Sequence, residues 1–251
     1  PPNRAYFVLA GVQDVLESLR GFQYSNDDLD FLRSQEVFAS DFLEYLRGLR
    51  FTGEVRAMPE GTIFFANEPV VEVTAPVVEA QIIETFLINQ INLQSILATK
   101  ASRVVYAARG KTVVDFAARR THGIDAANKL ARVSYMAGFS GTSNVMASAL
   151  YGIPTFGTMA HSFVQSFPTE EEAFCAYAGS FPDGSTFLVD TYDTVEGVRA
   201  AVRVAGEMGA RGRALQAVRL DSGALIDLSL KARAVLDEAG LPNVQVIASG
   251  G

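Results

Sequence analysis

From Lys111 onward, short apolar runs alternate with helical stretches, and this alternation constrains the fold more than any other feature of the chain. Six such runs end in small or polar residues: TVVDF, GFSGTS, PTFGT, TFLVDTYD, LQAVRLDSG and VQVIASGG. Helical patterns lie between them, for example over 169–178, 195–208 and 224–239. Strands that alternate with helices are typical of βα units and a parallel sheet. Six strands are fewer than the eight of a closed barrel, so we predict an incomplete α/β arrangement over residues 111–251.

Residues 1–110 follow a different pattern. A possible first strand is followed by helical spacing over 12–19 and by two amphipathic helices, NDDLDFLRSQ and FASDFLEYLRGLR. Their candidate N-caps are Ser25 or Asn26 for the first, and Ser40 or Asp41 for the second. EVRAMPEG and TIFFANEPVVEV predict antiparallel strands, and Pro76 starts a helix of over thirty residues in which we expect a break near Gln94. We therefore predict an α+β domain over 1–110 and an α/β catalytic domain over 111–251.

Composition excludes several classes of protein. The net charge is -7 and no cluster of Lys and Arg occurs, which argues against a nucleic-acid partner. The uncharged stretch 133–169 is interrupted by Gly, Ser, Thr and Pro154, so we expect no membrane span. One cysteine and no apparent leader favour a reducing, cytoplasmic location. The abrupt start and the strand close to the C-terminus lead us to expect further residues of the natural protein beyond both ends.

Residues suited to bind an anion follow the predicted strands. In chain order they are Arg119, Arg120, Thr142, Ser143, Asn144, His161, Asp190, Arg219, Asp221, Ser249, Gly250 and Gly251. The carboxyl ends of parallel strands meet at one rim, so we expect these residues to converge. Arginine forks match carboxylate or phosphate oxygens, and glycines let a phosphate approach the backbone. The set predicts a phosphorylated, anionic substrate.

Each member of this set also has a simpler explanation. An arginine pair is more often a solvated surface patch, and a lone histidine near a helix start usually packs or caps. Asp221 followed by Ser222 can cap the next helix, and a glycine pair marks many turns. The prediction of a site rests on the joint placement of these residues and on no single one of them.

Four segments resemble the nicotinate phosphoribosyltransferase family: AARRTHGID, GFSGTSNVMASALYGIPTFGTMAHSF, LVDTYDT and VRLDSGAL. The resemblance runs from about Ala10 onward. It implies an N-terminal α/β domain packed on an irregular α/β barrel, the type II phosphoribosyltransferase fold. It also implies that nicotinate and phosphoribosyl pyrophosphate are converted to nicotinate mononucleotide and pyrophosphate, with Mg²⁺ and coupled ATP hydrolysis.

The resemblance also implies roles for individual residues. His161 matches the histidine that ATP phosphorylates, Arg219 an arginine near base and ribose, and Asp221 the aspartate that binds ribose hydroxyls. Arg119 or Arg120 corresponds to the arginine region near the pyridine carboxylate. Thr142, Ser143 and Asn144 form the base-pocket loop, where a serine in place of the aspartate of the related nicotinamide enzyme favours the acid. Ser249, Gly250 and Gly251 match the start of a sugar-phosphate region. Asp190 is a further candidate substrate-binding residue, because it ends a strand of the same sheet.

Some features depart from the family pattern. A stacking tyrosine segment is absent before Pro1, and Ala224 replaces an acidic residue often found after DSG, so we assign no metal ligand to the chain. The resemblance implies a homodimer with shared active sites. Two alternatives stay open: a quinolinate phosphoribosyltransferase, and a non-catalytic pyridine-nucleotide-binding relative.

Overall fold

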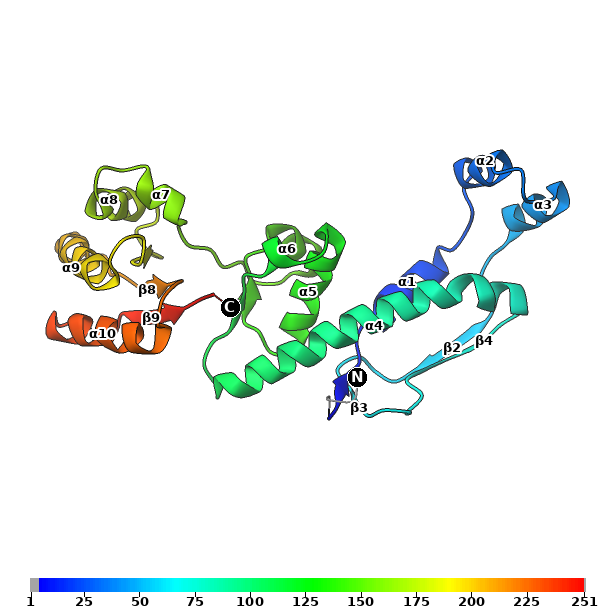
Figure 1. Cartoon of the computed structure of the whole chain (residues 1–251), viewed down its shortest axis with the longest axis horizontal. Helices are drawn as coiled ribbons and strands as arrows, with labels where there is room; N and C mark the ends of the chain where they lie inside the picture. The colour runs from blue at the N-terminus through cyan, green and yellow to red at the C-terminus, as the bar shows by residue number, and fades with distance from the viewer. Residues whose placement is uncertain (1–4, 251) are drawn as a thin grey trace. The chain divides into compact units, whose positions relative to one another are not determined.

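The computed structural model describes residues 5–250 and divides into two compact units, Pro1–Phe156 (unit 1) and Gly157–Gly251 (unit 2). Figure 1 shows the elements of each unit. The division of the chain into domains 1–110 and 111–251 stays a prediction.

Three short helices follow the first strand of unit 1: α1 (Val12–Arg20), α2 (Asn26–Ser34) and α3 (Ser40–Gly48). The predicted cap of α2 is confirmed, since the Ser25 hydroxyl accepts a hydrogen bond from the backbone N–H of Asp28 and the Asp28 carboxylate accepts one from that of Ser25. The predicted cap of α3 is wrong. Ala39 occupies the N-cap position and no side chain caps this helix, because α3 begins one residue earlier than a Ser40 cap requires.

The strands of the N-terminal region pair in an antiparallel manner, as expected. Strand β2 (Glu54–Ala57) pairs with β4 (Val71–Thr74). Strand β3 (Ile63–Phe64), which lies between them in the sequence, pairs instead with β1 (Phe7–Val8). The two pairs are therefore separate ribbons, each with its own partner from another part of unit 1.

The predicted long helix is continuous, and the expected break near Gln94 does not occur: α4 runs without interruption over Val77–Ala108 (Figure 1). Two of its buried polar side chains accept hydrogen bonds from the backbone of the segment that contains β1. The Thr99 hydroxyl accepts a hydrogen bond from the backbone N–H of Val8 at 2.9 Å, and the Ser95 hydroxyl accepts one from that of Ala10 at 3.1 Å. Polar side chains in the middle of α4 thus satisfy the backbone N–H groups of Val8 in β1 and of Ala10 shortly after it.

The rest of unit 1 contains the first βα units. Its elements are β5 (Val114–Asp115), the 3₁₀ turn η1 (Ala118–Arg120), α5 (Ile124–Met136), β6 (Gly141–Thr142) and α6 (Val145–Tyr151). Strands β5 and β6 are parallel, and Thr142 also forms a parallel bridge with Thr155. The predicted strand PTFGT is thus reduced to a single bridge.

Unit 2 is a parallel three-stranded sheet with helices around it. Its elements are α7 (His161–Gln165), α8 (Glu170–Ser180), β7 (Thr186–Leu188), α9 (Thr194–Ala210), β8 (Ala217–Leu220), α10 (Leu225–Glu238) and β9 (Gln245–Ala248). The strand order is β7-β8-β9. In the core, Phe174 of α8 stacks on Phe187 of β7 with ring centroids 4.7 Å apart. The predicted α/β class is confirmed, and within residues 5–250 the strands form no closed barrel.

Helix α9 lies close against the end of β7 because Gly197 has no side chain. A Cβ at this position would lie 2.1 Å from the carbonyl oxygen of Val189, the residue before Asp190. We expect Gly197→Ala to lower the free energy of unfolding by about 1–3 kcal/mol, since the backbone must shift. At Gly206, on the same helix, an added Cβ would have no atom within 4 Å. Gly206→Ala should therefore raise the free energy of unfolding by up to about 1 kcal/mol. Denaturant unfolding of both variants tests this; equal effects would show that the close approach does not matter.

Candidate functional site

The carboxyl ends of β7, β8 and β9 carry a connected polar network. The carboxylate of Asp190, which follows β7, accepts hydrogen bonds at Oδ2 from the backbone N–H of Asp221 at 2.8 Å and the hydroxyl of Ser222 at 2.6 Å. Its other oxygen, Oδ1, is buried and has no hydrogen-bond partner within the described residues. The side chain of Asp190 is only 1% exposed. An unpaired buried carboxylate oxygen is costly, so it marks a place where a donor is wanted.

Arg219, on β8, lies at the centre of this network. Its guanidinium donates from Nε to Ser249 Oγ at 2.7 Å, from Nη1 to Thr158 Oγ1 at 2.7 Å and from Nη2 to Asp221 Oδ1 at 2.9 Å. The Ser249 hydroxyl donates in turn to Asp221 Oδ1 at 2.7 Å. One planar fork therefore fixes groups from three separate segments of unit 2.

His161 is a partly exposed member of the group, with 37% of its side chain accessible. Its Nδ1 lies 3.1 Å from Thr191 Oγ1, which orients the ring. Its Nε2 lies 3.9 Å from Asp190 Oδ1 and 3.7 Å from Asp221 Oδ2. The imidazole therefore has one edge held by a hydroxyl and the other directed at two carboxylates.

Two carboxyl groups in unit 2 have shifted pKa values. Burial tends to raise the pKa of Asp221, but hydrogen bonds from Ser249 and Arg219 and the nearby charges of Arg219 and His161 outweigh it and lower the pKa. Burial raises the pKa of Glu170 to about 7, with the charges of Asp193 and Asp190 adding to the effect. Asp221 is thus kept as an anion, whereas Glu170 titrates near neutral pH.

In unit 1, the ends of β5 and β6 form a second polar group. Thr142 is fully buried, and its hydroxyl donates to Asp115 Oδ2 at 2.7 Å. The side chain of Asn144 caps α6 through Ala147 N–H at 3.1 Å and donates to Asn128 Oδ1 at 2.9 Å. Ser143 is half-buried, and within the described residues no side-chain hydrogen bond holds its hydroxyl. Ser143 is accordingly the member of this loop whose hydroxyl remains available to a ligand.

The remaining predicted residues lie at the strand ends expected for them. Arg119 and Arg120 are exposed in η1, directly after β5. Gly250 follows β9 with φ 125°, a conformation that favours glycine, and a Cβ there would lie 3.2 Å from the carbonyl oxygen of Asp221. Gly251 lies outside the described residues. The residues of unit 1 group around β5 and β6 and those of unit 2 around β7–β9; convergence of all six strand ends stays a prediction.

Sequence reasoning missed Asp115, Asn128 and Glu170. Asp115 ends the strand TVVD, so the strand-end rule that selected the other residues could have found it. Asn128 lies inside α5 and Glu170 in the first turn of α8, where no local pattern distinguishes them from ordinary helix residues.

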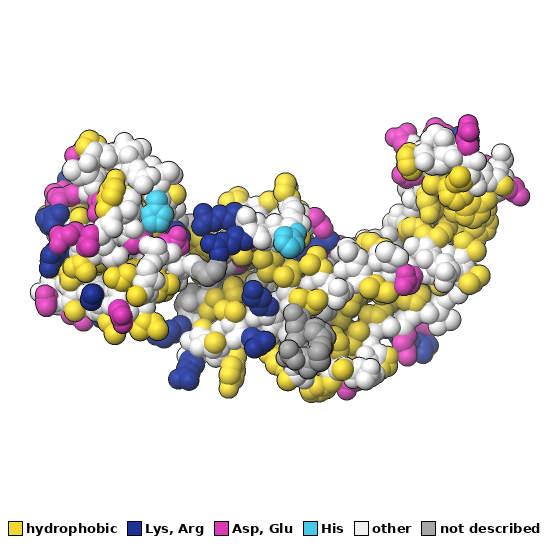
Figure 2. All heavy atoms as spheres, in the orientation of Figure 1, with side chains coloured by type: hydrophobic (Ala, Val, Ile, Leu, Met, Phe, Trp, Pro, Cys, Tyr) yellow, Lys and Arg dark blue, Asp and Glu magenta, His cyan; other side chains and the backbone are white. Residues whose placement is uncertain are grey.

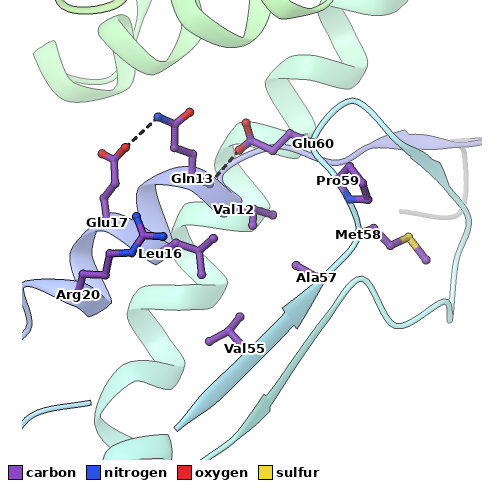
Figure 3. A pocket seen from close by; sticks show the side chains of 10 residues that line it. All are labelled: Val12, Gln13, Leu16, Glu17, Arg20, Val55, Ala57, Met58, Pro59 and Glu60. Carbon is purple, nitrogen blue, oxygen red and sulfur yellow. Dashed lines mark hydrogen bonds between the residues drawn. The ribbon is translucent and has the colours of Figure 1, made fainter. Parts of the chain in front are cut away.

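A cavity of about 520 Å³ in unit 1 contains none of these residues. It is bordered by α1 and by β2 with the turn that follows (Figure 3). Glu60 lies at its edge and is committed to the fold: Oε1 accepts from the backbone N–H of Gly11 at 2.6 Å, and Oε2 pairs with Arg132 at 2.5 Å. This cavity is therefore distinct from the candidate site.

Two absences apply to the described part of the chain. Within residues 5–250, no three His, Cys, Asp or Glu side chains are arranged to hold a metal ion. The positively charged Arg219 guanidinium in the centre of the unit 2 network suits an anion better than a metal ion, so we assign no described residue as a metal ligand. No helix in this range is long and apolar enough to cross a membrane.

The fold and the two polar groups define an α/β protein that presents arginine, histidine and carboxylates at the carboxyl ends of parallel strands, where the sites of α/β proteins lie. The model of the nicotinate phosphoribosyltransferase N-terminal domain matches residues 1–92, and that of the nicotinate phosphoribosyltransferase family matches residues 112–242. The chain belongs to the nicotinate phosphoribosyltransferase family.

Individual relatives agree with this assignment. A nicotinate phosphoribosyltransferase of Mycobacterium tuberculosis is 55% identical over 100% of this chain and 54% of its own length. One of Bacillus subtilis is 46% identical over 99% of this chain and 51% of its own length. The crystal structure of human nicotinic acid phosphoribosyltransferase matches with a TM-score of 0.91 and 30% identity, over 99% of this chain and 61% of that one. The chain thus spans about half the length of the curated relatives it matches.

Proposed function

We propose that this protein is a nicotinate phosphoribosyltransferase, which forms nicotinate mononucleotide and pyrophosphate from nicotinate and phosphoribosyl pyrophosphate in NAD salvage. The observation that carries the proposal is the Arg219 network with His161 beside it, in a chain 55% identical to a relative of that name.

In the proposed reaction, the ring nitrogen of nicotinate attacks the anomeric carbon of the ribose, and the bond from that carbon to the pyrophosphate oxygen breaks. The transition state has oxocarbenium character, so positioning and charge neutralisation provide the catalysis. The Asp221 carboxylate, held as an anion, binds ribose hydroxyls through Oδ2, because Oδ1 is occupied by Arg219 and Ser249. Mg²⁺ would bind with the pyrophosphate rather than on a residue of the described chain, and it would supply positive charge to neutralise the leaving group.

We assign His161 as the site of phosphorylation by ATP, which acts as a co-substrate. Thr191 holds Nδ1, and the exposed ring can reach a solvent-borne nucleotide. Asp190 Oδ1, buried without a hydrogen-bond partner, is the proposed acceptor for the proton that Nε2 gives up when the terminal phosphoryl group of ATP is transferred to this nitrogen and ADP leaves. Phosphorylation places negative charge beside two carboxylates, which disfavours the phosphorylated state unless cationic groups or Mg²⁺ compensate.

On the nicotinate side, Ser143 and an arginine of η1 are the proposed contacts. Arg119 or Arg120 pairs with the pyridine carboxylate, since a guanidinium binds a carboxylate through two points. Thr142 and Asn144 contribute by holding the loop, because their side chains are bonded within unit 1. Ser249 and Gly250 line the sugar-phosphate side, and Gly251 is assigned there from the resemblance alone.

We also propose that the protein is a homodimer with shared active sites and that it is cytoplasmic. Support for a partner comes from α2 and α3, where hydrophobic side chains gather at the surface (Figure 2). The exposed residues are Phe31, Val37, Phe38, Phe42 and Tyr45. Contiguous exposed apolar patches are typical of protein–protein contacts. The single cysteine fits a reducing compartment.

Pyrophosphate release with nicotinate, nicotinamide or quinolinate as the base tests the proposed function. We expect nicotinate to be preferred. Turnover of quinolinate would indicate the alternative with a dianionic base, and no turnover of any base would indicate a non-catalytic relative. Ser143→Asp should lower kcat/KM for nicotinate at least about tenfold relative to nicotinamide, because an added carboxylate repels the acid and accepts from the amide. Ser140→Asp, at an exposed position just before β6, is the control variant for the added charge.

A further inference from the structure

Asp115 is buried at the end of β5, and its functional groups connect two loops that the proposed function uses. Only 4% of the residue is exposed. In the parallel register it stands opposite Thr142 of β6. The loop after β5 leads to Arg119 and Arg120, and the loop after β6 contains Ser143 and Asn144.

Asp115 makes a hydrogen bond to each loop. Toward its own loop, Oδ1 accepts from the backbone N–H of Ala117 at 2.9 Å. Toward the other, Oδ2 accepts from the Thr142 hydroxyl at 2.7 Å, and its backbone oxygen accepts from the N–H of Ser143 at 2.8 Å. Both carboxylate oxygens are thus occupied, one on each side.

Thr142 extends the connection by one residue. Its hydroxyl donates to Asp115, so the oxygen is left to accept, and it does so from the backbone N–H of Asn144 at 3.0 Å. Asn144 in turn bonds Asn128 of α5. The chain of bonds runs from the η1 loop through Asp115 and Thr142 to the start of α6, and it leaves the hydroxyl of Ser143 directed by the backbone alone.

We propose that Asp115 is a positioning residue that sets the spacing between the η1 arginines and the Ser143 loop, and so determines affinity for an aromatic carboxylate. This inference rests on the proposed function, because it assigns both loops to nicotinate. An amide cannot replace the carboxylate: it offers one acceptor oxygen, whereas the Ala117 N–H and the Thr142 hydroxyl need two. Asp115→Asn therefore removes the hydrogen bond that holds one of the two loops.

Steady-state kinetics of the full natural chain test this positioning. For Asp115→Asn we expect KM for nicotinate to rise about tenfold, which is about 1.4 kcal/mol, with KM for phosphoribosyl pyrophosphate and kcat within about twofold of wild type. Thr142→Val, which removes only the hydroxyl, should likewise raise KM for nicotinate and leave the other two parameters nearly unchanged. Thr142→Ser, which keeps the hydroxyl, should give the wild-type KM for nicotinate. Asp237→Asn, at an exposed carboxylate near the C-terminal end of α10 that pairs with the partly buried Arg233, is the control.

Two outcomes overturn the inference: an unchanged KM for nicotinate, or KM values for both substrates that rise together as expected for general loss of structure. If Asp115→Asn fails to fold, the KM values of Thr142→Val and Thr142→Ser test the inference by the same criteria. Amide hydrogen exchange distinguishes a wrong positioning role for Asp115 from a wrong proposed function. Positioning predicts faster exchange at Ala117, Ser143 and Asn144 in Asp115→Asn, whichever base the wild-type protein uses, and unchanged exchange there overturns it.

Discussion

Arg219→Lys is expected to lower kcat/KM about a hundredfold or more. The guanidinium bonds Ser249, Thr158 and Asp221 simultaneously, and each comes from a different segment of unit 2. A lysine ammonium is a single point and cannot span three partners in these directions. Asp221 would lose its hydrogen bond from the guanidinium although a positive charge stays nearby, so the carboxylate proposed to bind ribose would no longer be held in one orientation.

The measurement is steady-state kcat/KM for phosphoribosyl pyrophosphate with nicotinate saturating, alongside thermal unfolding. Arg213→Lys provides the matched control, because Arg213 forms an exposed ion pair with Asp183 before β8 and lies outside the network. A loss of less than about threefold in Arg219→Lys would show that its charge alone matters and that the fork geometry does not.

His161→Ala is expected to abolish the gain in rate that ATP provides and to leave slow ATP-independent turnover. The methyl group cannot accept a phosphoryl group, and the acceptor Asp190 Oδ1 loses its nearest proposed donor. The base, ribose and sugar-phosphate contacts proposed above stay in place, so the chemical step itself persists. Steady-state turnover measured with and without saturating ATP gives the gain in rate that ATP provides.

The other histidine of the chain supplies the control for this experiment. His122 is exposed in the turn before α5, and His122→Ala should keep the full response to ATP. Phosphate incorporation from labelled ATP should be lost in His161→Ala and retained in His122→Ala. Unchanged steady-state turnover of His161→Ala at saturating ATP would contradict the assignment of a phosphohistidine.

The pattern of the sequence was sufficient for much of the fold. Helices α5, α8, α9 and α10 and the parallel strands follow from local periodicity and punctuation, and strand ends pointed to Asp190, Arg219, Asp221 and Ser249. It failed at α4, where the expected break near Gln94 is absent and Ser95 and Thr99 bond the backbone of the segment that contains β1. That partner lies more than 80 residues away in the sequence, out of reach of a local pattern.

The sequence alone determined the family, the α/β class and the residue types available at each strand end. Only the tertiary structure decided how those residues are used: Arg219 could have faced solvent but joins Thr158 and Ser249, and Thr142 could have met a ligand but is bonded to Asp115. The physical reason is that a side chain's partner depends on strand register and on the close approach of elements, as at Gly197 and Val189. These are set by packing across tens of residues, whereas the periodicity of a segment reports only which of its faces is buried.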